Sequence, residues 1–194
     1  LTEWCAQRSV KLIVDESFVD FSTGYKNNTL LSNQILDCNP NLIVVKSISK
    51  SYGVPGLRLG ILASSDTRLI DTIKKDVSIW NLNSFAEFYM QIFSKYESDY
   101  HKACHKFATE RERFWKELNT ISYLRVIPSQ ANYFLCEVLP PFTSHDLTVK
   151  LLNESNILIK DCSTKKAFGG RNYIRIAIRN REDNEMLIEV LKQD

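Results

Sequence analysis

The segment Ser47–Gly60, with the sequence SISKSYGVPGLRLG, is the part of the chain on which the prediction of the fold depends. It follows Leu42–Val45, a short apolar run after Asn-Pro that is typical of a buried strand. Lys50 comes shortly after the end of this predicted strand. Open α/β sheets bind their ligands just beyond the carboxyl ends of the strands. The segment therefore predicts a ligand site that includes Lys50, and an exposed basic loop is the alternative.

Three polar side chains around this lysine favour a phosphate-binding role. Ser47 and Ser49 supply hydroxyl groups, and Arg58 supplies a planar fork of N–H donors with a fixed positive charge. The G-x-x-x-x-G-K sequence of P-loop nucleotide-binding proteins does not occur in the chain. We therefore expect a phosphate group on these three side chains rather than a nucleotide on a P-loop.

A second predicted strand, Val10–Val14, ends at Asp15. Asp15 and Lys50 are separated by 35 positions, the size of one βαβ unit, so both are expected at the same edge of a parallel sheet. Pyridoxal phosphate chemistry uses such a set of groups: an amine that forms a Schiff base, a carboxylate at the pyridine nitrogen, and donors for the phosphate. A helix or turn cap is the alternative role for Asp15.

Taken together, D-E-x-F-x-D-F, S-x-S-K and P-G-L-R-L-G resemble the class I/II aminotransferase family of fold type I pyridoxal-phosphate enzymes. Within that family the chain is most similar to histidinol-phosphate aminotransferase and threonine-phosphate decarboxylase, over nearly its whole length. The resemblance implies an α/β fold. Residues 1–100 would form part of the large domain, with a mixed, mostly parallel sheet and helices, and residues 101–194 a small α+β C-terminal domain.

The resemblance also implies which part of a family member this chain represents. The family's glycine- or serine-rich loop, its ring-stacking aromatic residue and its asparagine at the ring oxygen all precede the matched region. We therefore expect the chain to correspond to the carboxyl-terminal half of a family member, which alone does not complete a cofactor site.

The resemblance assigns roles to individual residues. Lys50 would be the Schiff-base lysine, which also moves protons at the substrate, and Asp15 would pair with the pyridine nitrogen of pyridoxal 5'-phosphate. Arg175 falls on the position that binds the substrate α-carboxylate, and an arginine facing solvent is the alternative. The other candidates are Ser47, Ser49 and Arg58 for the phosphate, and Arg179 and Asn132 on the substrate side.

The type of reaction is not fixed by any single residue. Phe18 stands where many aminotransferases of this family have a tyrosine, and it cannot donate a hydrogen bond. Phe18, Trp80 and the R-I-A-I-R segment Arg175–Arg179 look more like threonine-phosphate decarboxylase. We expect a transaminase acting on an amino acid, in particular a phosphorylated one. The alternatives are a decarboxylase of a phospho-amino acid, and a truncated, non-catalytic module for dimerisation or binding.

The bulk composition restricts the class of protein. Hydrophobic residues make up 44% and charged residues 25% of the 194 residues, which is ordinary for a soluble globular protein. A net charge of +2 gives no broad basic surface, so we expect no nucleic-acid partner. No apolar stretch approaches the roughly 20 residues of a membrane span, so we expect no membrane partner. The first residue is Leu1 and no signal peptide is visible, so the chain looks trimmed or processed at its start.

The five cysteines are widely spaced and odd in number, which predicts free thiols and a cytoplasmic protein. His101, Cys104 and His105 share one face of a predicted helix but have no convincing fourth ligand, so we expect no metal site. From the resemblance we expect a small amino-acid substrate and a homodimer.

Overall fold

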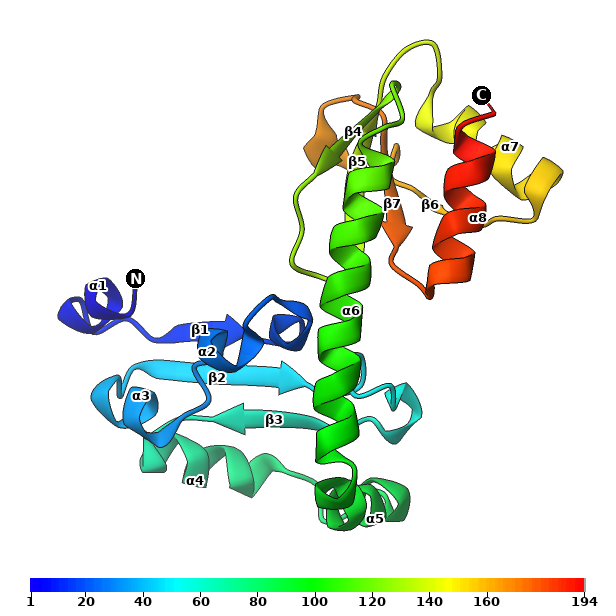
Figure 1. The fold of residues 1–194 in the computed structure, drawn as a ribbon. Helices are drawn as coiled ribbons and strands as arrows, with labels where there is room; N and C mark the ends of the chain where they lie inside the picture. Colours follow the sequence, from blue (N-terminus) through cyan, green and yellow to red (C-terminus); the bar gives the residue numbers. More distant parts are fainter. Residues whose placement is uncertain (194) are drawn as a thin grey trace. The chain divides into compact units, whose positions relative to one another are not determined.

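The protein is described by a computed structural model that covers residues 1–193. The chain divides into two compact units, Leu1–Cys104 and a second unit from His105 onward, and each unit is described by itself (Figure 1). The boundary expected from the sequence, between residues 100 and 101, lies close to this division. That the two units correspond to the two domains of a fold type I enzyme stays a prediction.

The first unit is built on a three-stranded sheet in the order β1-β2-β3. β1 runs parallel to β2, with Asp15 opposite Val45, whereas β3 is antiparallel to β2, with Ser47 opposite Gly60. The sheet is therefore mixed, and the arrowheads of β1 and β2 point to the same edge in Figure 1. The strands are β1 (Leu12–Asp15), β2 (Leu42–Ser47) and β3 (Gly60–Ala63).

The two faces of this sheet differ in burial. One face carries Leu42 and Val44, which pack with Leu36 in a small apolar core. The opposite face leaves Ile13 65% and Leu62 41% exposed, beside the strand ends that carry the predicted site. The helices of this unit are α1 (Thr2–Gln7), α2 (Tyr25–Asn28), α3 (Asn33–Cys38), α4 (Thr67–Asp76), α5 (Ser84–Ile92) and the start of α6 (Glu97–Leu118), with 3-10 turns η1 (Val19–Phe21), η2 (Pro55–Leu57) and η3 (Phe93–Lys95).

Two helix starts follow from side-chain capping. The sequence predicts a cap at Ser65 or Asp66 and a second cap at Asn180, and the structure shows Asp66 and Asn180 in these positions. The Asp66 carboxylate accepts a hydrogen bond from the Leu69 N–H at 3.1 Å and begins α4. In the second unit the side chain of Asn180 accepts from the Asp183 N–H at 2.8 Å and begins α8 (Arg181–Leu191). Such a helix start can be recognised in the sequence because the capping side chain and the backbone N–H that donates to it lie three residues apart.

Residues 22–28 are polar and contain one glycine, which predicts a loop, and this prediction is wrong. Gly24, with a φ of +69°, turns the chain into the single-turn helix α2. The side-chain amide of Asn28 closes this turn by donating to the Ser22 hydroxyl at 2.9 Å. Polar composition favoured a loop, but these two local features give a helical turn.

The second unit is an antiparallel sheet in the order β4-β5-β7-β6 with helices packed on one face. Ile174 and Ile176 of β7 are buried in its core with Phe114 of α6 and Phe134 of β5, whereas Arg175 is on the other, exposed face. The elements after α6 are β4 (Leu124–Ile127), β5 (Tyr133–Val138), α7 (Ser144–Ser155), β6 (Lys160–Asp161), η4 (Lys166–Phe168), β7 (Tyr173–Ala177) and α8.

Three further findings concern membrane-spanning helices, metal-binding groups and cysteines. Over residues 1–193 no helix combines the length and the apolar character needed to cross a membrane. Within the same range, no group of three or more His, Cys, Asp or Glu side chains could hold a metal ion. All five cysteines are free thiols, and four of them are buried.

Candidate active site

The carboxyl ends of β1 and β2 are joined through the hydroxyl of Ser17. The N–H of Ser47, the last residue of β2, donates to Ser17 Oγ at 2.9 Å. The N–H of Ser17 in turn donates to Asp15 Oδ1 at 2.8 Å. Parallel pairing and these bonds place Asp15 and Ser47 at one edge, as the sequence predicts. Sequence reasoning did not identify Ser17, which occupies the variable position of D-E-x-F.

Asp15 is an exposed carboxylate whose charge is stabilised by its neighbours. Hydrogen bonds from the side chain and then the backbone N–H of Ser17 lower the pKa of Asp15, slight burial opposes them, and the positive charge of Lys50 adds to the lowering. The carboxylate is therefore ionised at neutral pH.

Lys50 is exposed and lies in the turn that follows β2. Its Nζ is 4.7 Å from the centre of the Phe18 ring, the geometry of a cation–π contact. The turn is formed by backbone bonds from Tyr52 N–H to Ile48 O at 3.2 Å and from Gly53 N–H to Lys50 O at 3.3 Å. Phe18 lacks a hydroxyl group, so its contribution here is the face of its ring.

An open depression of about 480 Å³ lies beside Lys50, within the size range of small-molecule sites. Lys50 itself is not part of its lining. Arg58 contributes an exposed guanidinium from a residue with a φ of +54°, whereas Ser49 is buried. The site candidates that line the depression are Asp15, Ser47, Ser49 and Arg58, joined by Ser17.

Gly60 allows the two strands to approach beside this depression. A Cβ atom at this position would lie 3.2 Å from the carbonyl oxygen of Lys46 on β2. Glycine therefore lets β3 pair with the end of β2 opposite Ser47 without displacing the strand.

Two buried charged residues near the turn form a pair that the sequence did not indicate: Lys46, and Asp20 of the D-E-x-F-x-D-F pattern, to which no role was assigned. Lys46 Nζ and Asp20 Oδ1 are 2.6 Å apart, and the two side chains are 7% and 4% exposed. The Ser51 hydroxyl donates to the other carboxylate oxygen of Asp20 at 2.7 Å. Because these partners are far apart in the sequence, no local pattern indicates the pair.

The remaining candidates belong to the second unit. The guanidinium of Arg175 lies 5.3 Å from the centre of the Tyr133 ring, and its neighbours across the sheet are Leu135 on β5 and Lys160 on β6. Two cationic side chains and an aromatic ring thus share the exposed face of this sheet. Such a surface suits an anionic group.

Arg179 and Asn132 are already engaged within that unit. Arg179 Nε donates to Asp183 Oδ2 at 2.6 Å, and the backbone carbonyl of Asn132 accepts from the Ile178 N–H at 3.0 Å. What Arg175, Arg179 and Asn132 contribute to the Lys50 site stays a prediction.

Comparison with known proteins agrees with the residue patterns. Residues 1–191 match the family model described as aminotransferase class I and II. The chain is 34% identical over 185 residues to L-serine phosphate decarboxylase of Sulfurospirillum multivorans, covering 94% of this chain and 47% of that protein. It is 31% identical over 197 residues to threonine-phosphate decarboxylase of Salmonella typhimurium, covering 99% and 50% of the two proteins.

A solved structure shows the same fold. Histidinol-phosphate aminotransferase from Clostridium acetobutylicum superposes with a TM-score of 0.88 at 26% identity, covering 99% of this chain and 56% of that one. The chain spans about half the length of the relatives it matches. The resemblance read from the Asp15, Lys50 and Arg58 motifs is thereby confirmed, and the chain belongs to the class I and II aminotransferase family.

Proposed function

We propose that the whole protein is a pyridoxal-phosphate-dependent enzyme that decarboxylates a phosphorylated amino acid. The observation that supports the proposal is the shared edge of β1 and β2, where Asp15, Ser47, Ser49 and Arg58 line one depression and Lys50 directly follows Ser49 in the chain. The names of two relatives, both decarboxylases of phosphorylated amino acids, favour this reaction over the transamination expected from the sequence. Transamination remains the second candidate because of the fold shared with histidinol-phosphate aminotransferase.

The residues of the first unit fit pyridoxal 5'-phosphate by their chemistry. Lys50 would hold it through its amine, and Asp15, ionised at neutral pH, would hold a proton at the pyridine nitrogen. Ser47, Ser49 and Arg58 would bind the phosphate with hydroxyl donors and a guanidinium. When bound, the cofactor would supply an electron-withdrawing ring that takes up the electron pair left at the substrate α-carbon.

The choice of reaction depends on how this chain orients the substrate. The residues that hold the substrate would determine which bond at its α-carbon is positioned to break, and therefore which product forms. Arg175 would bind the α-carboxylate through its planar fork, and Lys50 would move a proton at the α-carbon. Phe18 has no hydroxyl group and would therefore donate no hydrogen bond to a bound cofactor.

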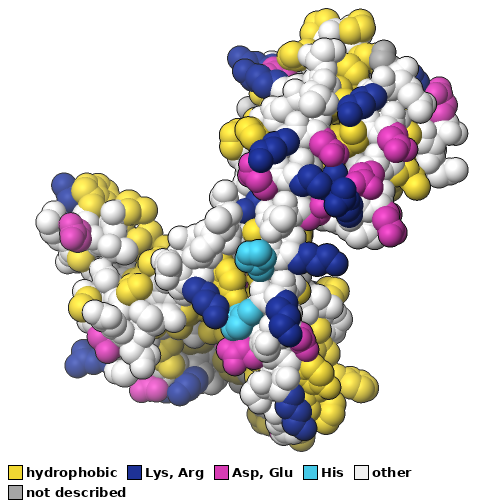
Figure 2. All heavy atoms as spheres, in the orientation of Figure 1, with side chains coloured by type: hydrophobic (Ala, Val, Ile, Leu, Met, Phe, Trp, Pro, Cys, Tyr) yellow, Lys and Arg dark blue, Asp and Glu magenta, His cyan; other side chains and the backbone are white. Residues whose placement is uncertain are grey.

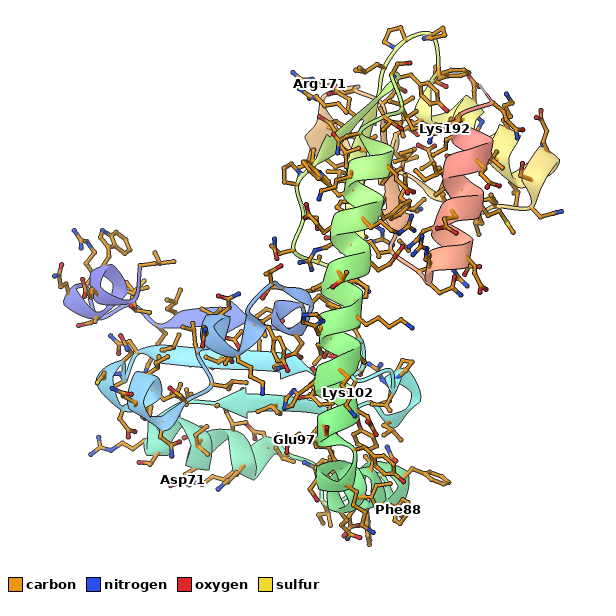
Figure 3. All side chains as sticks on the ribbon, in the orientation of Figure 1. Asp71, Phe88, Glu97, Lys102, Arg171 and Lys192 are labelled. Carbon is orange, nitrogen blue, oxygen red and sulfur yellow. The ribbon has the colours of Figure 1, made fainter. Side chains whose placement is uncertain are left out.

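We also propose that the protein is a homodimer located in the cytoplasm, where its free thiols would stay reduced. The surface proposed for the dimer contact is the apolar patch of residues 79–90. Figure 2 shows hydrophobic side chains gathered over α5, and Figure 3 shows Phe88 pointing away from the sheet. Its main members are Ile79 (91% exposed), Trp80 (90%), Phe85 (77%), Phe88 (59%) and Met90 (47%). Exposed apolar patches of this kind mark protein contacts.

The reaction is tested on the whole protein loaded with pyridoxal phosphate. Phosphothreonine, phosphoserine and histidinol phosphate are supplied in turn, and carbon dioxide release and keto-acid exchange are measured separately. We expect carbon dioxide from a phospho-amino acid, and a loss of at least about a hundredfold in Lys50→Ala because the proton-transferring amine is gone. Amino transfer without carbon dioxide would establish the transaminase instead. Full cofactor loading with neither product would support the non-catalytic module.

Asp15→Asn is expected to lower turnover by about a hundredfold or more, since the amide cannot carry the charge that holds the ring proton. The melting temperature should hardly change, because Asp15 is exposed. The pKa of Asp15 lies below its usual 3.8, so protonation of this carboxyl should not limit the wild-type rate above about pH 4. Asp37→Asn, an exposed acid of α3, is the control and should leave the pH–rate profile unchanged. Turnover of Asp15→Asn within a few fold of wild type would reduce Asp15 to a structural role.

Arg175→Lys is expected to raise KM for the amino acid by roughly ten- to a hundredfold, because lysine lacks the two-pronged geometry that matches a carboxylate. Cofactor content should stay the same, since the proposed phosphate donors lie in the other unit. Arg179→Lys is the matched control, because Arg179 is already paired with Asp183, and its KM should change less than about threefold. A large KM effect at Arg179 alone would move the carboxylate assignment to that residue.

Phe88→Lys is expected to convert the dimer to a monomer, because a charge in a buried apolar contact is strongly unfavourable. Light scattering coupled to size exclusion gives the mass. Leu158→Lys, at an apolar residue of the second unit that is 76% exposed, should leave the mass unchanged. A monomeric wild-type protein, or a dimer in both variants, would contradict the proposed contact.

A further inference from the structure

The carboxylate of Asp20 connects three segments of the proposed site. Its Oδ1 is 2.6 Å from Lys46 Nζ, and its Oδ2 accepts from the Ser51 hydroxyl at 2.7 Å. Lys46 immediately precedes Ser47, and Ser51 immediately follows Lys50. One side chain on η1 therefore holds both the strand before the Lys50 turn and the turn itself.

The surroundings of this carboxylate make its position well defined. Asp20 and Lys46 are both nearly inaccessible to solvent, so neither charge can turn to water when the contact is lost. The ring of Tyr52 lies 5.9 Å from Lys46 Nζ and stacks on Tyr100 with ring centres 4.2 Å apart. The pair lies beside these rings and nearly out of contact with solvent, which strengthens its electrostatic attraction.

The segment that Asp20 holds is the one that carries Lys50. The backbone bonds that shape the turn are long, at 3.2 Å to Ile48 O and 3.3 Å to Lys50 O, and the Lys50 side chain is exposed. Asp20 also lies on the segment of Phe18, whose ring faces Lys50 Nζ at 4.7 Å. Asp20 thus contacts the residue that follows Lys50, and it lies two positions after the residue whose ring Lys50 contacts.

We propose that Asp20 is a positioning residue for Lys50: by holding Lys46 and Ser51 together it fixes the turn and directs the Lys50 amine toward the edge that carries Asp15. The inference rests on the proposed function of Lys50 and adds a residue that touches neither substrate nor cofactor. The two contacts of Asp20 have different effects. The Lys46 ammonium neutralises the buried carboxylate, and the Ser51 hydroxyl connects the carboxylate to the turn that carries Lys50.

The chain contains a matched comparison for this contact. Glu16 is also a buried carboxylate, 5% exposed, and accepts from the Thr29 hydroxyl at 2.7 Å and from the Leu30 N–H at 2.6 Å. Both sites thus have a hydroxyl on a buried acid at the same distance. Only the Ser51 hydroxyl is adjacent to Lys50.

The test compares Ser51→Ala with Thr29→Ala in the whole protein, because each removes one hydroxyl and leaves the buried charges in place. Hydrogen exchange of residues 48–53, followed by mass spectrometry without cofactor, should become faster by about tenfold in Ser51→Ala only. In the loaded enzyme kcat should fall by about ten- to a hundredfold in Ser51→Ala while KM stays within about twofold. Ser51→Thr, which keeps the hydroxyl, should restore both values.

Two results would overturn the inference. One is equal exchange of residues 48–53 in Ser51→Ala and Thr29→Ala, which would mean that Asp20 does not order the turn. The other is faster exchange in Ser51→Ala with an unchanged kcat, which would mean that order in the turn does not position Lys50. Failure of the proposed function has a separate readout. A catalytically active Lys50→Ala variant would show that Lys50 is not the catalytic amine, whereas the hydrogen exchange of residues 48–53 is measured without catalysis.

Discussion

The parallel pairing of β1 with β2 is the constraint on which the rest of the proposed site depends. In the observed register Asp15 lies opposite Val45, so both strands end at the same edge and the S-I-S-K segment begins beside the acid. A shift of β1 by one residue would turn Asp15 to the other face of the sheet. The bond from Ser47 N–H to Ser17 Oγ supports this register at the strand ends where the proposed site lies.

The charges near that edge divide into two groups with different physical roles. Asp15, Lys50 and Arg58 are exposed and can meet a ligand. Asp20 and Lys46 are buried, neutralise each other and hold the chain that carries the exposed groups. A buried pair is costly to form and more costly to break, which suits a fixed support better than a binding group. The exposed Asp15 carboxylate suits a binding group instead, because hydrogen bonds from Ser17 keep it charged while it remains accessible to a ligand.

Sequence reasoning found the features that are encoded locally. The strand ends at Asp15 and before Lys50, the caps at Asp66 and Asn180, and the burial of alternate residues around Arg175 follow from short-range patterns. It assigned no role to Ser17, Asp20 or Lys46, because these residues bond to partners 26 to 31 positions away. A lysine at the end of a strand looks exposed in the sequence, and only the fold shows the buried carboxylate that accepts it. The helical turn α2 was missed for a different reason, since its polar residues outweighed the glycine that begins it.

The central claim is that Lys50 is the amine that holds the cofactor, and chemical trapping tests it most directly. The whole protein is incubated with pyridoxal phosphate, reduced with borohydride, digested and mapped by mass spectrometry. Our account predicts one stably modified lysine, Lys50, with the neighbouring Lys46 unmodified because it is buried against Asp20. Modification of Lys46 or of another lysine in place of Lys50, in a protein that is catalytically active, would contradict the account.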